Sequence, residues 1–357
     1  MTYWERRALL KQAYYDRAGK QALDTIGTAY ERMIRQMHED TKRIIGNFQS
    51  YFGLTKKEAL DLLNKPAPKA ALDGIRERIE QITDPVLRRR AEAALSADAY
   101  RARLSRIDAI EASARVNATQ AAEVEQRIGN LHLEKMVKEG YARTMFDVQQ
   151  YTGLGFGFTG VDKRRINQIL RMKWSGKSYS NRVWQNSEVT ADTLSKALTE
   201  AVLNGKTSRQ TFDELMEQAK GSRFAANRLL RTETNYATNQ ATADAFEDAG
   251  VERYRFMAVL DGRTSDICQR KDGNEYLLSE KEVGKNWPPL HPWCRSTCEP
   301  VIDGLTRERM KRWARDPNTG EQMYVDANMT YKQWIETVKP RQPQSKLRSK
   351  IDKALTK

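Results

Sequence analysis

The fold is decided first by residues 23–51, LDTIGTAYERMIRQMHEDTKRIIGNFQSY. Large apolar side chains recur there three, four or seven residues apart, at Leu23, Ile26, Tyr30, Met33, Met37, Ile44, Phe48 and Tyr51. This spacing places them on one stripe of a helix and leaves the charged residues on the rest of its surface. The pattern predicts one long helix from residue 3 to about residue 52.

A second long helical stretch is predicted from Asp84-Pro85, a pair that fits a helix start, to about Gln150. No proline lies between Pro85 and Pro288, which permits long helices. Between these stretches, Thr55 and Glu58 form a capping box for a short helix, and another helix is expected at roughly 70–82. The apolar positions of the second stretch are mostly small and in near-heptad phase: Leu104, Ile107, Ala114, Ala118, Ala121, Ile128 and Leu131. We therefore expect a mainly α fold with an N-terminal long-helix bundle over residues 1–150.

Glycine marks the next boundaries. Residues 151–160, YTGLGFGFTG, contain four glycines and break any helix. A phosphate-binding loop would need a Lys-Ser or Lys-Thr pair that does not follow, so we interpret this stretch as a Gly-rich hinge. A helical region is expected over 161–250, with helices at about 162–172, 180–203, 208–220 and 222–249 that end near Gly205, Gly221 and Gly250.

The pattern changes after Gly250. The stretch ERYRFMAVL alternates apolar and polar residues, which predicts a strand. It opens a small C-terminal α+β segment, residues 251–303, which we name the Cys/His module. Residues 304–357 are expected to form a C-terminal extension with a basic tail.

The net charge suggests a polyanionic neighbour. The chain has 61 Lys and Arg against 47 Asp and Glu, a formal charge of +14. Double-stranded DNA is the first candidate, although Arg-rich solvated helix faces give the same count. Residues 339–357 hold seven lysines and arginines against Asp352, and Lys346, Arg348 and Lys350 are the candidate DNA contacts there. A solvated tail is the alternative interpretation.

The chain begins without the apolar segment of a secretory signal, and no apolar run reaches the roughly 18 residues of a bilayer span. We therefore expect no membrane span, and synthesis in a cytoplasm. An odd number of cysteines in a reducing compartment argues against a disulfide framework and raises metal binding instead. The three cysteines are Cys268, Cys294 and Cys298.

Candidate zinc ligands gather in the Cys/His module. His291, Cys294 and Cys298 follow Cys268 after a gap, and three thiolates with one imidazole can close a tetrahedral structural site. Three reduced buried cysteines beside a loop histidine are the alternative. A nucleophilic Cys294 would need a base, an orienting residue and a pocket that the sequence does not identify. We expect no catalytic residues.

The module resembles the C-terminal domain of phage head morphogenesis proteins of the Mu F-like family. That family has an Asp before Arg-Thr, then cysteines, an Asp-Gly pair and a closing Pro-Pro-x-His-Pro-x-Cys-Arg segment. The matching residues are Asp261, Arg263, Thr264, Cys268, Asp272, Gly273, Pro288, Pro289, His291, Pro292, Cys294 and Arg295. The upstream RTETNYATNQATADAF also resembles the family's helix, with Arg231, Thr232, Glu233 and Asn239 in place.

The likeness extends along nearly the whole chain, through the YWERR opening, WSGKSYSNRVW and RDPNTGEQMYVDANMTYKQW. One departure concerns the cysteines: Ser265 and Ser296 stand where family members often have cysteine, and Cys298 follows two residues after Ser296. The candidate zinc cluster is therefore either rebuilt as a Cys3His set or dispensable.

The resemblance implies a low-copy minor capsid protein of a tailed bacteriophage, which is not an enzyme. It would act in head (procapsid) assembly at the portal vertex or head interior. The implied partners are the portal protein, capsid or scaffold proteins and packaged double-stranded DNA. Two alternatives differ in class: a zinc-dependent or Cys/His nuclease or toxin-like enzyme of phage origin, and a stand-alone DNA-binding protein. An enzyme would need a metal with an open coordination position.

Overall fold

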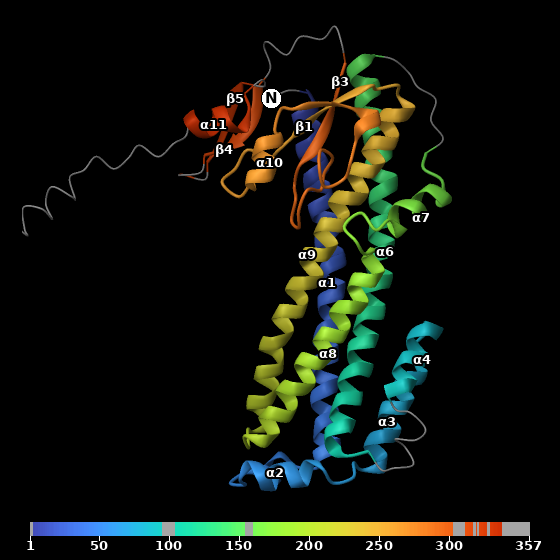
Figure 1. Cartoon of the computed structure of the whole chain (residues 1–357), viewed down its shortest axis with the longest axis vertical. Coiled ribbons are helices and arrows are strands. Elements are labelled where there is room, and N and C mark those ends of the chain that lie inside the picture. The colour runs from blue at the N-terminus through green and yellow to red at the C-terminus, as the bar shows by residue number, and fades with distance from the viewer. Residues whose placement is uncertain are drawn as a thin grey trace, which may run out of the picture. The chain divides into compact units, whose positions relative to one another are not determined.

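The computed structural model describes residues 3–94, 104–153, 160–302, 311–316, 319, 321–326 and 329–337. Helices predominate, and short strands occur in the C-terminal part (Figure 1), so the predicted mainly α fold with a small α+β module is confirmed. Most of the predicted hinge, residues 154–159, lies outside the described residues. The candidate DNA contacts Lys346, Arg348 and Lys350 also lie outside them.

The first predicted helix ends earlier than expected. Helix α1 spans Tyr3–Ile45, and Gly46 then takes a positive φ of 85° that stops it. A separate 3-10 turn, η1, spans Phe48–Tyr51 and is capped by the Asn47 side chain. The predicted stripe is nevertheless buried from Ile26 to Tyr51, because η1 continues the same apolar face.

Short helices follow: α2 spans Lys56–Leu63, α3 spans Lys69–Glu80 and α4 spans Pro85–Ala94. The predicted capping box is present, because Thr55 accepts from the Glu58 backbone and the Glu58 carboxylate accepts from Thr55. The predicted stretch from Pro85 to Gln150 is not one helix. Helix α6 begins at Arg106 and ends at Thr152, and Ser105 caps it reciprocally with Asp108.

Helix α6 buries the small residues Ala114, Ala118 and Ala121, as their spacing predicted. Leu131 is 62% exposed, so its assignment to this stripe was wrong. The drift of a straight helix relative to a seven-residue repeat explains the error, since the stripe rotates by about 20° per heptad.

The next helices are α7 (Lys163–Arg171), α8 (Tyr179–Leu203) and α9 (Ser208–Asp248). Gly205 and Gly250 have φ values of 62° and 70° at the predicted stops. The predicted stop at Gly221 was wrong, because α9 runs through it. Ser222 lies inside α9, and its hydroxyl lies 2.9 Å from that of Thr190 in α8.

The Cys/His module is built on a three-stranded antiparallel sheet. Strand β1 (Arg253–Met257) lies between β2 (Glu275–Leu277) and β3 (Thr297–Val301), with helix α10 (Asp266–Lys271) and the 3-10 turn η2 (Leu278–Glu280) in the connections. Phe256 in β1 pairs with Cys298 in β3. The strand predicted at ERYRFMAVL is thus confirmed, and Tyr254 and Phe256 point into the core while their neighbours are half-buried.

The residues after the module form further regular structure. Strands β4 (Lys311–Arg315) and β5 (Gln322–Asp326) pair antiparallel, and α11 spans Tyr331–Thr337. They share a second small core with the module, because Leu260 forms a parallel bridge with Ala314 and packs with Trp334. The predicted extension therefore holds a structured part that supports the module.

The chain forms two compact units. Unit 1 comprises Met1–Tyr14, Val137–Asp162 and Asn235–Lys357, and unit 2 comprises Tyr15–Met136 and Lys163–Thr234. Helices α1, α6 and α9 contribute residues to both, whereas the Cys/His module belongs to unit 1. Among the described helices, none has an apolar stretch of the length and purity that a bilayer crossing requires.

Candidate functional site

Three of the four predicted zinc ligands come together in unit 1. Cys268 lies in α10, and His291 and Cys294 lie in the loop that leads into β3. The Cys268 sulfur is 3.2 Å from His291 Nε2 and 3.8 Å from the Cys294 sulfur. All three ligand atoms lie within 4.8 Å of one another, which is the spacing that a single metal ion needs.

Cys298 is not part of this group. It is a strand residue of β3, 6% exposed, and it packs in the core of the module with Tyr254 and Trp287. Burial raises the pKa of its thiol well above the usual value, and the charge of Cys294 raises it further. The structure thus gives a Cys-His-Cys set in place of the predicted Cys3His set.

The charge distribution in this set favours a thiolate at Cys294. A hydrogen bond from the Cys268 thiol is the main cause that holds the pKa of Cys294 well below its usual value, and a hydrogen bond from His291 acts in the same direction. The same contact raises the pKa of Cys268, and the bond to Cys294 raises the pKa of His291. A thiolate beside an imidazole is the donor chemistry that a soft divalent metal selects.

Ser265 occupies the remaining side of His291. Its hydroxyl lies 2.7 Å from His291 Nε2, and the other ring nitrogen lies 2.7 Å from the carbonyl oxygen of Pro292. The imidazole is therefore held between two oxygens, which fixes its orientation toward Cys268. Ser265 directly precedes helix α10, which carries Cys268. The same turn of chain therefore contacts His291 through Ser265 and supplies Cys268.

An ion pair between two motif residues fixes the loops around this group. Asp261, 3% exposed, accepts two hydrogen bonds from the Arg295 guanidinium at 2.6 and 2.7 Å. Its carboxylate also accepts from the Arg263 backbone at 2.9 Å and from the Thr264 hydroxyl at 3.2 Å. Although burial opposes ionisation, the bonds from Arg295 and Arg263 outweigh it and lower the pKa of Asp261.

A second buried carboxylate joins the module to the segment after it. Asp272 accepts from the Ala258 backbone and from the Tyr331 backbone, each at 2.8 Å. Gly273 follows with a φ of 80°, and its amide donates to Phe256 at 2.9 Å. A side chain there would be strained and would meet Thr330. The Asp-Gly pair of the motif is thus explained by a turn that links β1 to α11.

The remaining motif residues have separate places. Pro289 follows a cis peptide bond at the start of the His291 loop. Arg231 and Glu233 lie on α9 in unit 2, where the Arg231 side chain is exposed and contacts Asp16 at 3.4 Å. Glu233 is buried beside the Trp174 indole nitrogen, 3.3 Å away, and burial raises its pKa to about 7.

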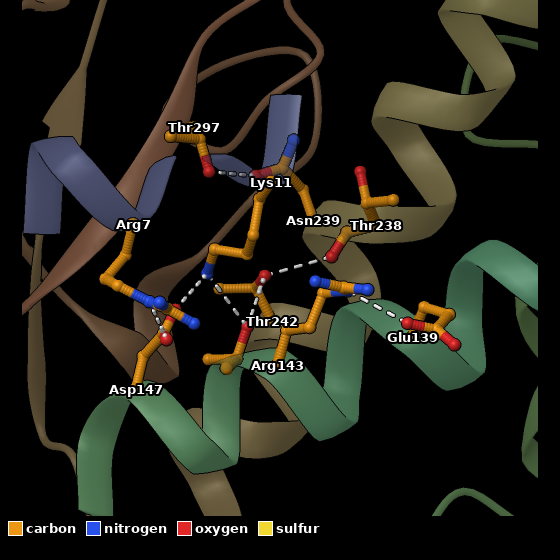
Figure 2. Close-up of polar contacts among 10 residues, drawn as sticks. Arg7, Lys11, Glu139, Arg143, Asp147, Thr238, Asn239, Thr242 and Thr297 are labelled. Atoms are coloured by element: carbon orange, nitrogen blue, oxygen red, sulfur yellow. Dashed lines mark hydrogen bonds and ion pairs between the residues drawn. The ribbon is translucent and has the colours of Figure 1, made fainter. Parts of the chain in front are cut away.

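A polar cluster that the sequence analysis missed lies between α1, α6 and α9 in unit 1 (Figure 2). Asp147 is fully buried; Arg7 donates to it, and Lys11 lies 3.2 Å from its second oxygen. Lys11 also donates to Thr144, whose hydroxyl meets Thr242 at 3.3 Å. The i, i+4 spacing of Arg7 and Lys11 was a signal for a shared acidic partner, but it does not identify Asp147.

A buried acid in unit 2 was missed as well. Glu125 of α6 is fully buried, and the Tyr30 hydroxyl donates to its Oε2 atom at 2.7 Å. Its other oxygen has no partner among the described residues. Burial raises the pKa of Glu125 to about 7. Tyr179 completes the cluster by donating to the Glu125 backbone carbonyl, and it packs where Gly129 leaves room for its ring.

Residues 192–299 match the family described as Phage Mu protein F like protein. This range contains every motif residue described above, so the predicted resemblance is confirmed there. The chain is also 22% identical over 191 residues to the NAD(+)–arginine ADP-ribosyltransferase EFV of Enterococcus faecalis. That alignment covers 50% of this chain and 39% of the relative. No solved structure matches the chain.

Proposed function

We propose, from the premise that residues 192–299 are Mu F-like, that the chain is a minor capsid protein that acts in assembly of a tailed phage head. In this role it associates with the portal protein and with capsid or scaffold proteins, and it contacts packaged DNA. Its place is the head interior or portal vertex, after assembly in the host cytoplasm. The family match is the observation that carries this proposal.

The geometry of the motif supports a structural role. The Asp261 carboxylate accepts two hydrogen bonds from Arg295, and the Asp272 carboxylate accepts from two backbone amides. A catalytic carboxylate would need a pKa near the working pH and access to substrate, whereas Asp261 is buried and its pKa is lowered. These residues fold the module, and the module presents a stable surface to neighbouring proteins.

From the similarity to the ADP-ribosyltransferase we infer no such activity for this chain. The chain spans about two fifths of that relative, so the matched part is compatible with a region that two otherwise different proteins share. We propose that this chain turns over neither NAD nor nucleic acid. Its Cys-His-Cys group offers three ligands, so a bound zinc would take its fourth ligand from elsewhere. No carboxylate joins the group among the described residues, and we propose that it serves as a metal staple, which small modules with little core often need.

The proposed metal is zinc, bound by Cys268, His291 and Cys294. When bound, zinc would supply a rigid link between α10 and the His291 loop. Purified full-length protein should carry about one zinc per chain by mass spectrometry of the metal, and Cys294→Ser should lose it. Cys298→Ser is the matched control and should keep it, since Cys298 lies outside the group. A metal-free wild-type chain prepared without chelators would contradict the assignment.

Co-sedimentation tests the assembly role. We expect the full chain, co-expressed with the portal and capsid proteins of its phage, to sediment with procapsids in a density gradient. Omission of the portal protein should release it if the portal is the binding partner. Retention of the chain at the top of the gradient, while complete procapsids form and sediment, would contradict the proposal. Incubation of the same fractions with labelled NAD or DNA should show no product.

A further inference from the structure

The most one-sided charge in the described chain lies in residues 163–182, KRRINQILRMKWSGKSYSNR. Seven lysines and arginines occur there without a single Asp or Glu. In other helices many basic residues pair with acids one turn away, as in the ion pairs of Arg115 with Glu111 and Arg209 with Asp213. This segment comprises α7, the turn after it and the first residues of α8.

Helix α7 separates its basic residues from its core residues. Ile166 and Ile169 are 2% exposed and pack α7 into the interior of unit 2, to which the helix belongs. Lys163, Arg164 and Arg171 are exposed, and i, i+7 spacing places Arg164 and Arg171 on one stripe. From residue 163 to 171 the stripe extends about 12 Å, given a rise of about 1.5 Å per residue.

Helix stability does not explain these charges. Lys163 and Arg164 lie in the first turn of α7, which has no acidic residue. Positive charge at a helix N-terminus opposes the macrodipole and is mildly destabilising. Asp162 lies directly before the helix, but the two basic residues of its first turn do not themselves stabilise it, so they point to a role outside the fold.

The adjoining turn extends the positive surface. Lys177 donates to the neutral Gln185 side chain at 2.7 Å, and Arg182 donates to Ser175. Neither hydrogen bond uses a carboxylate. Two acids adjoin this segment: the exposed Asp162 directly precedes α7, and Glu233, buried beside Trp174, interacts with Arg182. The N-terminus of α8, capped by Ser178, adds its own partial positive charge at this point.

We propose that the exposed cationic face formed by Lys163, Arg164, Arg171, Lys173 and Lys177, named the α7 basic face, binds the phosphate backbone of double-stranded DNA without sequence preference. The choice of DNA among polyanions rests on the proposed function, because packaged DNA is the polyanion inside a head. A stripe of about 12 Å spans three to four base pairs at about 3.4 Å each, enough for several phosphate contacts.

Fluorescence anisotropy with a short random-sequence DNA duplex tests this proposal on the full chain. The variant combines Lys163→Gln, Arg164→Gln, Arg171→Gln and Lys173→Gln. The matched control removes two arginines and two lysines from exposed positions among acids in unit 2: Arg32→Gln, Arg35→Gln, Lys56→Gln and Lys57→Gln. Both should retain the helical circular dichroism and unfolding temperature of the wild type.

The α7 variant should bind DNA at least about tenfold more weakly near 0.1 M salt, and its slope of log affinity against log salt should fall by about 3 to 4. The control should change the slope by less than about 1. Equal losses in the two variants would overturn the proposal. It would also be overturned if the α7 variant kept full DNA affinity but no longer sedimented with procapsids, since the face would then contact protein.

The assembly role and DNA binding by the α7 basic face can be refuted independently of each other. A chain absent from procapsids whose DNA affinity still depends on the α7 basic face refutes the assembly role and keeps this inference. A chain that joins procapsids and ignores DNA at low salt refutes this inference and keeps the assembly role.

Discussion

Asp261→Ala should destabilise the Cys/His module by about 3–5 kcal/mol, because it leaves the Arg295 guanidinium partly buried without its partner. The same change removes acceptors for the Arg263 amide and the Thr264 hydroxyl. Hydrogen–deuterium exchange is the suitable measurement, since it reports the module separately from unit 2. Protection of the β1 and β3 amides should fall by about two to four orders of magnitude.

Arg263→Gln is the matched control for this prediction. The Arg263 side chain is 82% exposed and lies 3.7 Å from Asp261, so its contribution is screened by water. The variant should change protection of the module by less than about a factor of three, or about 0.5 kcal/mol. If Asp261→Ala had an equally small effect, the Asp261–Arg295 pair would not be what holds the module together.

Glu125→Gln should stabilise unit 2 by about 2–3 kcal/mol near pH 8.5. The pKa of Glu125 rises from 4.5 to about 7 on folding because the carboxyl is buried, and each pKa unit is worth about 1.4 kcal/mol. The neutral acid therefore favours the folded state fully below pH 4.5, and this contribution is lost as the pH rises through about 7. Glutamine stays neutral and still offers Tyr30 an acceptor.

Urea denaturation at a series of pH values measures this effect. The wild-type free energy of unfolding should decrease between pH 4.5 and about 7, and the Glu125→Gln variant should decrease less steeply. Glu111→Gln, which breaks an exposed i, i+4 pair with Arg115, should leave the slope unchanged. A parallel pH dependence in wild type and Glu125→Gln would show that Glu125 is ionised or hydrated in the folded chain.

Local features of this fold were predictable from sequence. The Thr55–Glu58 capping box, the glycine stops at 205 and 250 and the strand at β1 each depend on residues close in sequence. The apolar stripe from Ile26 to Tyr51 was also predicted, since burial of one helix face follows directly from periodicity.

Features that depend on distant partners were not predictable. Gly221 does not end α9; it is exposed, and buried residues on either side of it, Ala219 and Ala226, belong to the same helix. Cys298 has plausible ligand spacing, yet strand pairing turns it into the core of the module. Glu125 and Asp147 are buried with partners 95 and 140 residues away in sequence, at Tyr30 and Arg7. The support from β4, β5 and α11 reaches the module through Leu260 and Asp272, which carry no sequence signal for it.

The copy number of the chain in DNA-filled heads tests the central claim most directly. Quantitative mass spectrometry of gradient-purified heads should find it at a constant molar ratio to the portal protein, and at a small fraction of the major capsid protein. Its absence from both procapsids and filled heads, with the portal protein present at full occupancy, would contradict the account.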